Sequence, residues 1–317
     1  MPGDGVLFVA FGGPTPGCCR RFDPCPGSEA RCFVRAVVGE RPGAEARIAE
    51  VVAHYEQLGG FSPFQPLTLK QVQGVAARLA QQGLPVPVRV GMRYWPPYIA
   101  EALQALAALG CRRLVVAILS AFQSPASWDV YQRLVAEGLA AVAPEVAVTY
   151  LDPWYEEAGF VTAWADHIRQ AYRALAPLAP AEVLLVYTAH ALPVAMAAAS
   201  PYVQQFTQAA AAVARCLGQP PYRLAYQSQA SGTGVPWLQP DVNDALRQAK
   251  AEGYRGVVVA PLGFLCDHVE VLYDLDVEAQ ATARACGLAF ARAPTVGTHP
   301  AFLAMLSERL AACLRAA

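Results

Sequence analysis

The sequence predicts an α/β fold that consists of two similar halves. Short runs of β-branched and other apolar residues alternate with segments of helical periodicity along the whole chain. Strands that are apolar on both faces and are joined by helices form parallel sheets covered on both sides. A segment of the first half also recurs in the second, which indicates that one doubly wound unit is present twice.

Each expected strand is a run of five or six mostly apolar residues, and each expected helix repeats apolar residues three or four positions apart. The strands are residues 6–11, 88–92, 114–119, 146–151, 183–187, 223–227 and 256–261. The helices are residues 45–58, 67–79, 98–109, 129–142, 156–175, 203–216, 242–251, 269–286 and 302–314.

The repeat aligns residues 97–122 with residues 240–265 without a gap, and ten of the 26 positions are identical. The identical pairs include a proline, a glycine and an arginine, which are not generic core residues. We therefore expect one domain over residues 1–150 and a second over residues 151–317. Ligands of such sheets bind beyond the carboxyl ends of the strands, so we expect the chemistry there.

The composition limits the possible classes of protein. The 317 residues are 55% hydrophobic, which excludes a disordered or collagen-like chain. Lys and Arg total 24 against 25 Asp and Glu, so no overall charge favours nucleic acid. Nine scattered cysteines argue against a disulfide framework. Pro193 and Pro201 interrupt the uncharged residues 183–214, so we expect a cytoplasmic protein without a transmembrane segment.

Two segments that follow expected strands carry candidate chemistry. The first contains His190, in a stretch with no other ionisable side chain. An imidazole in apolar surroundings suits a metal ligand or a base near neutral pH. The alternative is a capping or core histidine bonded to a backbone carbonyl. No phosphate-binding glycine motif follows the first strand, so nothing supports a nucleotide.

The second segment opens a helix with Asp267 or His268 near its N-cap. Glu270, Asp274 and Glu278 follow at a spacing of four residues, so the three carboxylates lie on one helix face. Like charges at this spacing repel each other. They form either a row of oxygen ligands for a divalent cation or a solvated surface stripe.

Several motifs in this order resemble the ferrochelatases, which insert ferrous iron into a porphyrin late in haem synthesis. The resemblance runs over nearly the whole chain. Its longest motif is PLGFLCDHVEVLYDLDVE at residues 261–278, and His190 lies in TAHALP. The other matching motifs are YEQLGGFSP at residues 55–63, GMRYW at 91–95, YQS at 226–228 and WLQP at 237–240.

The resemblance implies two Rossmann-like doubly wound domains with parallel sheets and an active-site cleft between them. The enzyme would bind a distorted macrocycle and remove its pyrrole protons. His190 and Glu270 would be the catalytic and metal-binding pair, one binding Fe2+ and the other accepting protons, with the assignment left open. Asp274 and Glu278 would continue outward as a metal relay.

The resemblance also implies that Phe11, Ser62, Arg93 and Tyr131 bind the substrate. Some members carry a tyrosine able to bind the product iron where this chain has Phe11, and phenylalanine cannot do so. Residues 14–37 match the family poorly and are rich in cysteine and arginine. We expect a lid loop there whose arginines meet porphyrin propionates, and the alternative is a mobile, solvated loop.

The expected substrates are Fe2+ and either protoporphyrin IX or coproporphyrin III. We expect transient contact with other enzymes of haem synthesis. We expect no cofactor and no [2Fe–2S] cluster, because the spacing of Cys18, Cys19, Cys25 and Cys32 matches no cluster motif and the last helix holds only Cys313. The alternative functions are a cobalt or nickel chelatase of a sirohydrochlorin-type ring and a tetrapyrrole-binding protein without catalysis.

Overall fold

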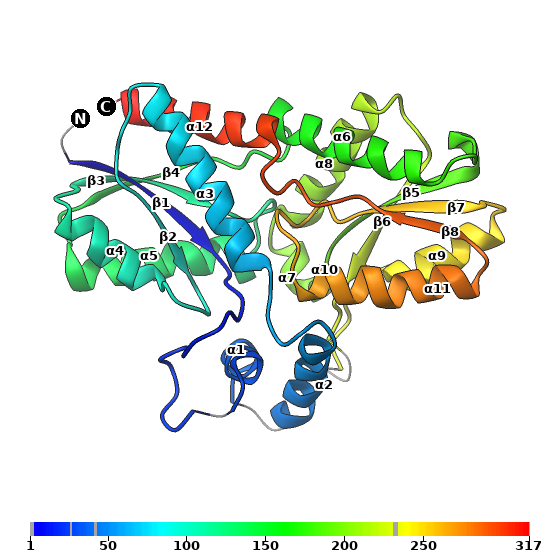
Figure 1. Ribbon diagram of the computed structural model, residues 1–317, viewed down its shortest axis with the longest axis horizontal. Helices are drawn as coiled ribbons and strands as arrows, with labels where there is room; N and C mark the ends of the chain where they lie inside the picture. The colour runs from blue at the N-terminus through cyan, green and yellow to red at the C-terminus, as the bar shows by residue number, and fades with distance from the viewer. Residues whose placement is uncertain (1–2, 26, 41–42, 231–233, 317) are drawn as a thin grey trace. The chain divides into compact units, whose positions relative to one another are not determined.

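A computed structural model describes residues 3–25, 27–40, 43–230 and 234–316 of the chain. The chain folds into two compact units, each built on one sheet (Figure 1). The first unit comprises Met1–Leu119, Val130–Leu151 and Leu306–Ala317, and the second comprises Ser120–Asp129 and Asp152–Met305.

The first unit contains a parallel sheet of order β2-β1-β3-β4, flanked by helices on both faces. Its strands are β1 (Asp4–Ala10), β2 (Val88–Met92), β3 (Arg113–Ile118) and β4 (Ala147–Tyr150). Its helices are α1 (Glu29–Val38), α2 (Ala44–Gln57), α3 (Phe64–Gln81), α4 (Ile99–Ala108) and α5 (Val130–Val142).

The second unit repeats this order as β6-β5-β7-β8, again entirely parallel. Its strands are β5 (Val183–His190), β6 (Tyr222–Gln227), β7 (Gly256–Ala260) and β8 (Ala289–Arg292). Its α-helices are α6 (Ala158–Ala174), α7 (Val194–Ala198), α8 (Tyr202–Cys216), α9 (Val242–Ala251), α10 (Val269–Tyr273) and α11 (Gln280–Ala285). Three short helices are η1 (Pro125–Asp129), η2 (Pro180–Glu182) and η3 (Asp274–Ala279), of which η1 and η3 are π-helical.

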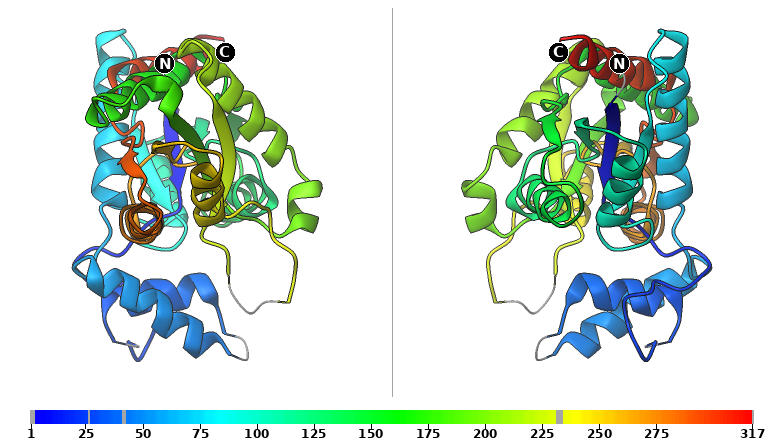
Figure 2. Two further views of the ribbon diagram at one scale, coloured as in Figure 1. Left: turned by 90° about the vertical axis from the view of Figure 1, so that its right-hand side faces the viewer. Right: turned by 90° about the vertical axis from the view of Figure 1, so that its left-hand side faces the viewer.

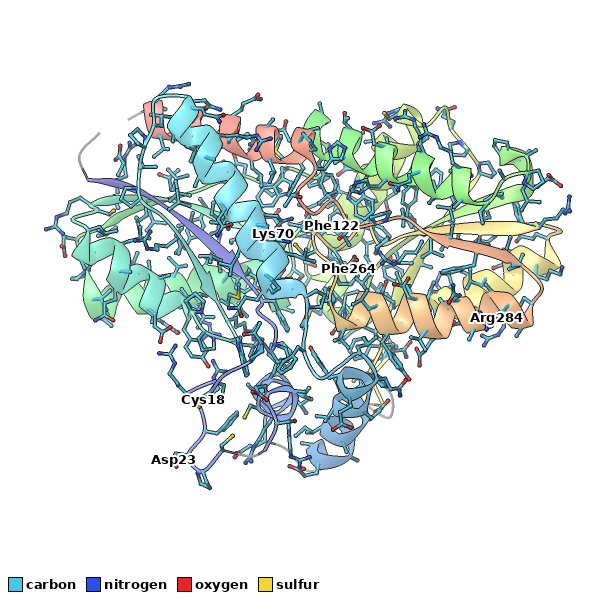
Figure 3. All side chains as sticks on the ribbon, in the orientation of Figure 1. Cys18, Asp23, Lys70, Phe122, Phe264 and Arg284 are labelled. Carbon is cyan, nitrogen blue, oxygen red and sulfur yellow. The ribbon has the colours of Figure 1, made fainter. Side chains whose placement is uncertain are left out.

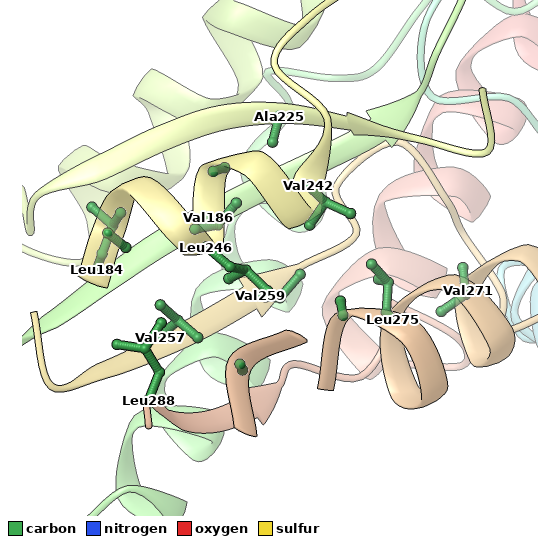
Figure 4. Close-up of a cluster of buried hydrophobic side chains, with 14 residues drawn as sticks. Leu184, Val186, Ala225, Val242, Leu246, Val257, Val259, Val271, Leu275 and Leu288 are labelled. Carbon is green, nitrogen blue, oxygen red and sulfur yellow. The ribbon is translucent and has the colours of Figure 1, made fainter. Parts of the chain in front are cut away.

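The core of the second unit shows why both strand faces are apolar. Leu184 and Val186 of β5 pack with α9 and with the α10–η3–α11 helix on one face of the sheet (Figure 4). Leu185 and Tyr187 point to the opposite face, because successive strand residues alternate, and they are equally buried. The sheet is therefore covered on both sides, as the sequence predicts.

The matching sheet orders confirm the prediction of two similar doubly wound domains. The aligned segments of the repeat form α4 followed by β3 in one unit and α9 followed by β7 in the other. The registers also correspond, because Asp4 pairs with Arg113 in the first sheet and Val183 with Gly256 in the second. All seven expected strands are present, but the short edge strand β8 was not predicted.

The compact units differ from the predicted ranges in two segments. Ser120–Asp129 packs with the second unit, and the chain returns to the first at Leu306, within α12 (Pro300–Arg315). There the Arg113 guanidinium donates to the Leu314 carbonyl at 2.9 Å. None of the helices among the described residues combines the length and the hydropathy that crossing a membrane requires.

The predicted lid loop over residues 14–37 is wrong in its second part, which forms α1. The helix begins at Ser28, whose hydroxyl accepts a hydrogen bond from the Arg31 amide. Phe33 of α1 is buried and packs edge-on against Phe11 at 6.1 Å. α1 and α2 lie beyond the carboxyl end of β1 (Figures 1 and 2). Residues 29–38 therefore form a packed helix and not a solvated loop.

The Gly91→Ala substitution in β2 should destabilise the protein by about 1–3 kcal/mol, because an added methyl group overpacks the core. A Cβ atom at Gly91 would lie 2.6 Å from the Cα of Ile99 and 3.2 Å from the Cβ of Ala102. The measurement is the free energy of unfolding in urea. Arg89→Ala, on the same strand but in solvent, is the control and should change it by less than about 0.5 kcal/mol. Equal effects of the two substitutions would contradict this account.

Candidate active site

The candidate site is built around His190, the last residue of β5. Its Nδ1 lies 2.5 Å from the Ala191 carbonyl oxygen, so Nδ1 carries a proton and donates it. The Tyr202 hydroxyl donates to the His190 carbonyl at 2.9 Å. These contacts direct Nε2 towards Glu270, whose Oε2 is 3.5 Å away. The two side chains are 36% and 43% exposed, so a ligand can reach them.

Glu270 is held by the start of α10. His268 is the N-cap, and its Nδ1 accepts a hydrogen bond from the Glu270 amide at 3.2 Å. Burial lowers the pKa of His268, which keeps this imidazole neutral and its Nδ1 available as an acceptor. The ring of Phe264 (Figure 3) packs edge-on against it at 4.7 Å. Of the two N-cap candidates, the structure therefore selects His268 over Asp267.

Gln227 joins Glu270 to the strands, a role that the sequence analysis did not assign. The Thr188 hydroxyl of β5 donates to Gln227 Oε1 at 2.7 Å, and Gln227 Nε2 donates to the Glu270 carbonyl at 2.8 Å. Gln227 and Thr188 are buried. Gln227 lies in the YQS motif, but the sequence could not show which backbone group its amide binds.

Asp274 accepts a short hydrogen bond from the Ser228 hydroxyl. Burial raises the pKa of Asp274, the Ser228 bond opposes this, and the charges of Glu270 and Glu278 raise it further, to about 7. Asp274 is therefore able to take up or release a proton near neutral pH. Ser228 itself has a left-handed backbone with φ of 63°, which is uncommon for serine and marks a constrained position.

The helix that carries the three carboxylates changes type along its length. Residues 269–273 are α-helical, and the following turn, η3, is π-helical. Four residues rotate an α-helix slightly more than one turn and a π-helix slightly less, so the two drifts oppose each other. Glu270, Asp274 and Glu278 thus remain in a row, with Glu278 exposed. Over the described ranges, no three His, Cys, Asp or Glu side chains are arranged to hold a metal ion together.

The pKa of the His190 imidazole is also shifted, in the direction that favours its charged form. Burial alone lowers the pKa of its imidazole, but the charge and hydrogen bond of Glu270, the Ala191 carbonyl and the charge of Asp274 outweigh burial and raise it to about 9. In the metal-free protein, His190 is therefore protonated at neutral pH beside the Glu270 carboxylate. That proton must leave before Nε2 is able to bind a metal ion.

An ion network on the other side of this helix involves Arg292, which the sequence analysis missed. The guanidinium Nε of Arg292 donates to Asp276 Oδ1 at 2.6 Å, and its Nη1 donates to Asp267 Oδ1 at 3.2 Å. The Thr295 hydroxyl also donates to Asp267, at 3.0 Å. Arg292 is only 14% exposed and ends the unpredicted strand β8. It fixes both ends of the segment that carries Glu270 and Asp274.

The predicted substrate-binding residues belong to the first unit. Phe11 follows β1, and its ring is 4.8 Å from that of Tyr94. The Arg93 guanidinium lies 4.5 Å from the centre of the same Tyr94 ring. Ser62 is buried, and its amide donates to the Pro14 carbonyl at 2.9 Å. Tyr131 is buried, which raises the pKa of its hydroxyl and keeps it neutral.

The chain is similar to known proteins over nearly its whole length. A family model described as Ferrochelatase matches residues 3–313. The chain is 34% identical over 312 residues to the coproporphyrin III ferrochelatase of Mycolicibacterium smegmatis, covering 97% of this chain and 89% of that protein. It is 37% identical over 318 residues to the coproporphyrin III ferrochelatase of Frankia alni, covering 96% and 78%. Among solved structures, SirB from Bacillus subtilis with Fe3+ has a TM-score of 0.61 at 12% identity, covering 97% of this chain and 94% of that chain, which shows a shared fold.

Arg292→Met should destabilise the protein by about 3 kcal/mol, because Asp267 and Asp276 would lose their common cation. The value lies at the low end of the range for buried pairs, since both carboxylates are partly exposed. Urea unfolding measures the effect. Arg247→Met on the surface of α9 is the control and should cost less than about 1 kcal/mol. A loss no larger than that of the control would mean that the network does not hold this helix.

Glu270→Gln should lower the pKa of His190 from about 9 towards the ordinary value of about 6.5. The amide removes the negative charge that favours the imidazolium, while the lowering effect of burial remains. Titration of the imidazole by NMR in metal-free protein measures the change. Glu252→Gln, which alters an ion pair with Arg223, is the control and should leave the midpoint unchanged. An unchanged midpoint in Glu270→Gln would disprove the coupling.

Proposed function

The chain belongs to the ferrochelatase family, and we propose from this premise that it inserts Fe2+ into coproporphyrin III at a centre formed by His190, Glu270 and Asp274. Membership of the ferrochelatase family supports the first part of the proposal, which is the insertion of iron into a porphyrin in haem synthesis. The choice of coproporphyrin III is supported by the names of relatives that are 34% and 37% identical to this chain.

The observation that carries the assignment of the centre is the 3.5 Å approach of His190 Nε2 to Glu270 Oε2. A porphyrin must lose two pyrrole protons as Fe2+ enters, so the site needs both a metal ligand and proton acceptors. Imidazole nitrogen suits iron, and carboxylates suit protons. We assign iron binding to Nε2 of His190 and proton uptake to Glu270 and Asp274.

The charges of the site fit this assignment. In the resting protein the His190 imidazolium and the Glu270 carboxylate neutralise each other, with one proton between them. Fe2+ displaces that proton when it binds Nε2, and Glu270 then faces the metal and the pyrrole nitrogens with a negative charge. The pKa of Asp274 is about 7, so this carboxylate is able to take up a pyrrole proton. Once protonated, Asp274 is neutral and adds no isolated charge to the site. Glu278 continues the row into solvent as a path for protons or for incoming metal.

The first unit supplies groups suited to a flat ring with carboxylates. Phe11 and Tyr94 provide ring faces, and Arg93 lies against Tyr94. The Arg21 guanidinium donates to the Arg93 carbonyl at 3.0 Å, so a second cation lies next to the first. Coproporphyrin III carries more propionates than protoporphyrin IX, and paired cations favour the more anionic ring.

The proposal places the reaction in the cytoplasm and needs no group besides the two substrates. That the chain carries no iron–sulfur cluster stays a prediction, as does transient contact with other enzymes of haem synthesis. A bent macrocycle, with its nitrogen lone pairs exposed to the metal, remains part of the proposal.

Anaerobic Fe2+ insertion, followed by porphyrin absorbance, tests the function. Coproporphyrin III and protoporphyrin IX are offered separately to the wild type and to His190→Ala. We expect faster turnover of coproporphyrin III and a loss of about 100-fold or more in kcat for His190→Ala, since the metal ligand is removed. Porphyrin binding, measured by fluorescence, should be nearly unchanged in the variant.

His167→Ala is the matched control, because His167 lies in the same unit and binds the Pro294 carbonyl away from this centre. It should retain activity. Preference for protoporphyrin IX would overturn the substrate assignment. Binding of both porphyrins without metal insertion would favour a tetrapyrrole-binding protein, and insertion of Co2+ into a sirohydrochlorin alone would favour the cobalt chelatase.

A further inference from the structure

Four of the nine cysteines lie within residues 18–32, which belong to the first unit, whereas His190 and Glu270 belong to the second. The Sγ atoms of Cys25 and Cys32 are 3.4 Å apart, which is direct contact between two free thiols. The Cys19 thiol is also within hydrogen-bonding contact of Cys32. No role in iron insertion uses these side chains.

The thiols differ in their access to solvent. Cys25 is exposed, whereas Cys19 and Cys32 are each only 3% exposed. Burial, together with the neighbouring thiols Cys25 and Cys19, raises the pKa of Cys32. A reagent in solution therefore reaches Cys25 first, and Cys32 is placed to react only with a sulfur already beside it.

The segment before Cys25 and the helix that carries Cys32 both have contacts within the first unit. In the segment, the Tyr98 hydroxyl donates to the Cys19 carbonyl at 2.5 Å, and Arg21 lies over the Tyr98 ring at 5.2 Å. Cys32 is part of α1, whose Phe33 packs into the aromatic cluster around Phe11. A disulfide bond of ~2 Å is reached from the present contact by a small movement of Cys25.

We propose that Cys25 and Cys32 form a reversible disulfide bond in exchange with a low-molecular-weight disulfide. The inference goes beyond the proposed function and does not depend on it. A metal–thiolate site fits less well, because Cys19, Cys25 and Cys32 are neighbours but no three His, Cys, Asp or Glu side chains of the described ranges are placed to hold a metal ion.

The reaction has two exchange steps. The Cys25 thiolate attacks one sulfur of the small disulfide, which forms a mixed disulfide at Cys25 and releases one small thiol. The Cys32 thiolate then attacks Sγ of Cys25, and the second small thiol leaves. Both cysteines are oxidised, the small disulfide is reduced to two thiols, and the two cysteine protons end on those thiols. The second step is intramolecular, and this proximity compensates for the small thiolate fraction that the raised pKa of Cys32 allows.

The disulfide joins the arginine-bearing segment before Cys25 to α1. The Cys18 side chain marks this segment in Figure 3. Arg21 in this segment contacts Arg93 and Tyr94, and Phe33 of α1 contacts the same Tyr94 at 6.3 Å. Oxidation therefore fixes the two segments around Tyr94 in their present arrangement.

The test oxidises the full chain with glutathione disulfide under denaturant-free conditions and counts free thiols before and after. We expect loss of two thiols, a proteolytic fragment that links Cys25 to Cys32, and full recovery of the thiols with dithiothreitol. In Cys25→Ser, the count of free thiols should not fall by two after oxidation. No stable disulfide-linked fragment that contains Cys32 should accumulate. Because Cys25 is exposed, this variant should fold like the wild type.

Cys216→Ser, an exposed cysteine of the second unit, is the matched control and should still form the link. Three results would overturn the proposal: a full count of free thiols after oxidation, a link between Cys19 and Cys32 instead, or glutathione that stays bound to Cys25. Visible absorption by an iron–sulfur cluster in anaerobically purified protein, lost in Cys25→Ser, would replace it with a metal site.

Discussion

The parallel strand order of the second sheet is the constraint on which the candidate centre depends. In a parallel sheet all strands end at one edge, so β5, β6 and the segment after β7 bring His190, Ser228 and Glu270 to the same place. These residues are far apart along the chain. Gln227 then fixes the distance between sheet and helix, because its amide bonds to both.

The charges on the α10–η3 segment are divided between two sides. Asp267 and Asp276 share the Arg292 guanidinium, which neutralises them within the protein. Glu270 and Asp274 interact with the positive charge of His190, and that charge is itself removable as a proton. The same helix therefore combines a side paired with Arg292, which holds it in place, with a side that carries an aspartate whose pKa is near neutral pH.

The sequence predicts most of the architecture and the proximity of His190 and Glu270, but not the residues that hold them in place. The periodic segments and the repeat are local signals, so seven strands and the doubled fold follow from them. β8 is missed because it is a short, partly exposed edge strand. α1 is missed although it has a buried apolar face at Phe33 and Val34, because its arginines and cysteines favour interpretation as part of a loop. Gln227 and Arg292 act through partners distant in sequence, and neither spacing nor motif identifies those partners. The π-helical turn η3 is not predicted either, because the sequence contains no pattern that distinguishes it from an α-helical turn.

The matching registers of the two sheets identify equivalent positions at their carboxyl edges. Aligning Asp4–Arg113 with Val183–Gly256 places Phe11 at the position equivalent to His190, and the β1–β2 and β5–β6 pairs place Arg93 at the position equivalent to Gln227. One unit thus carries an aromatic and a cationic side chain where the other carries an imidazole and an amide. The two units share a backbone topology but differ in side-chain chemistry at equivalent positions of this sheet edge.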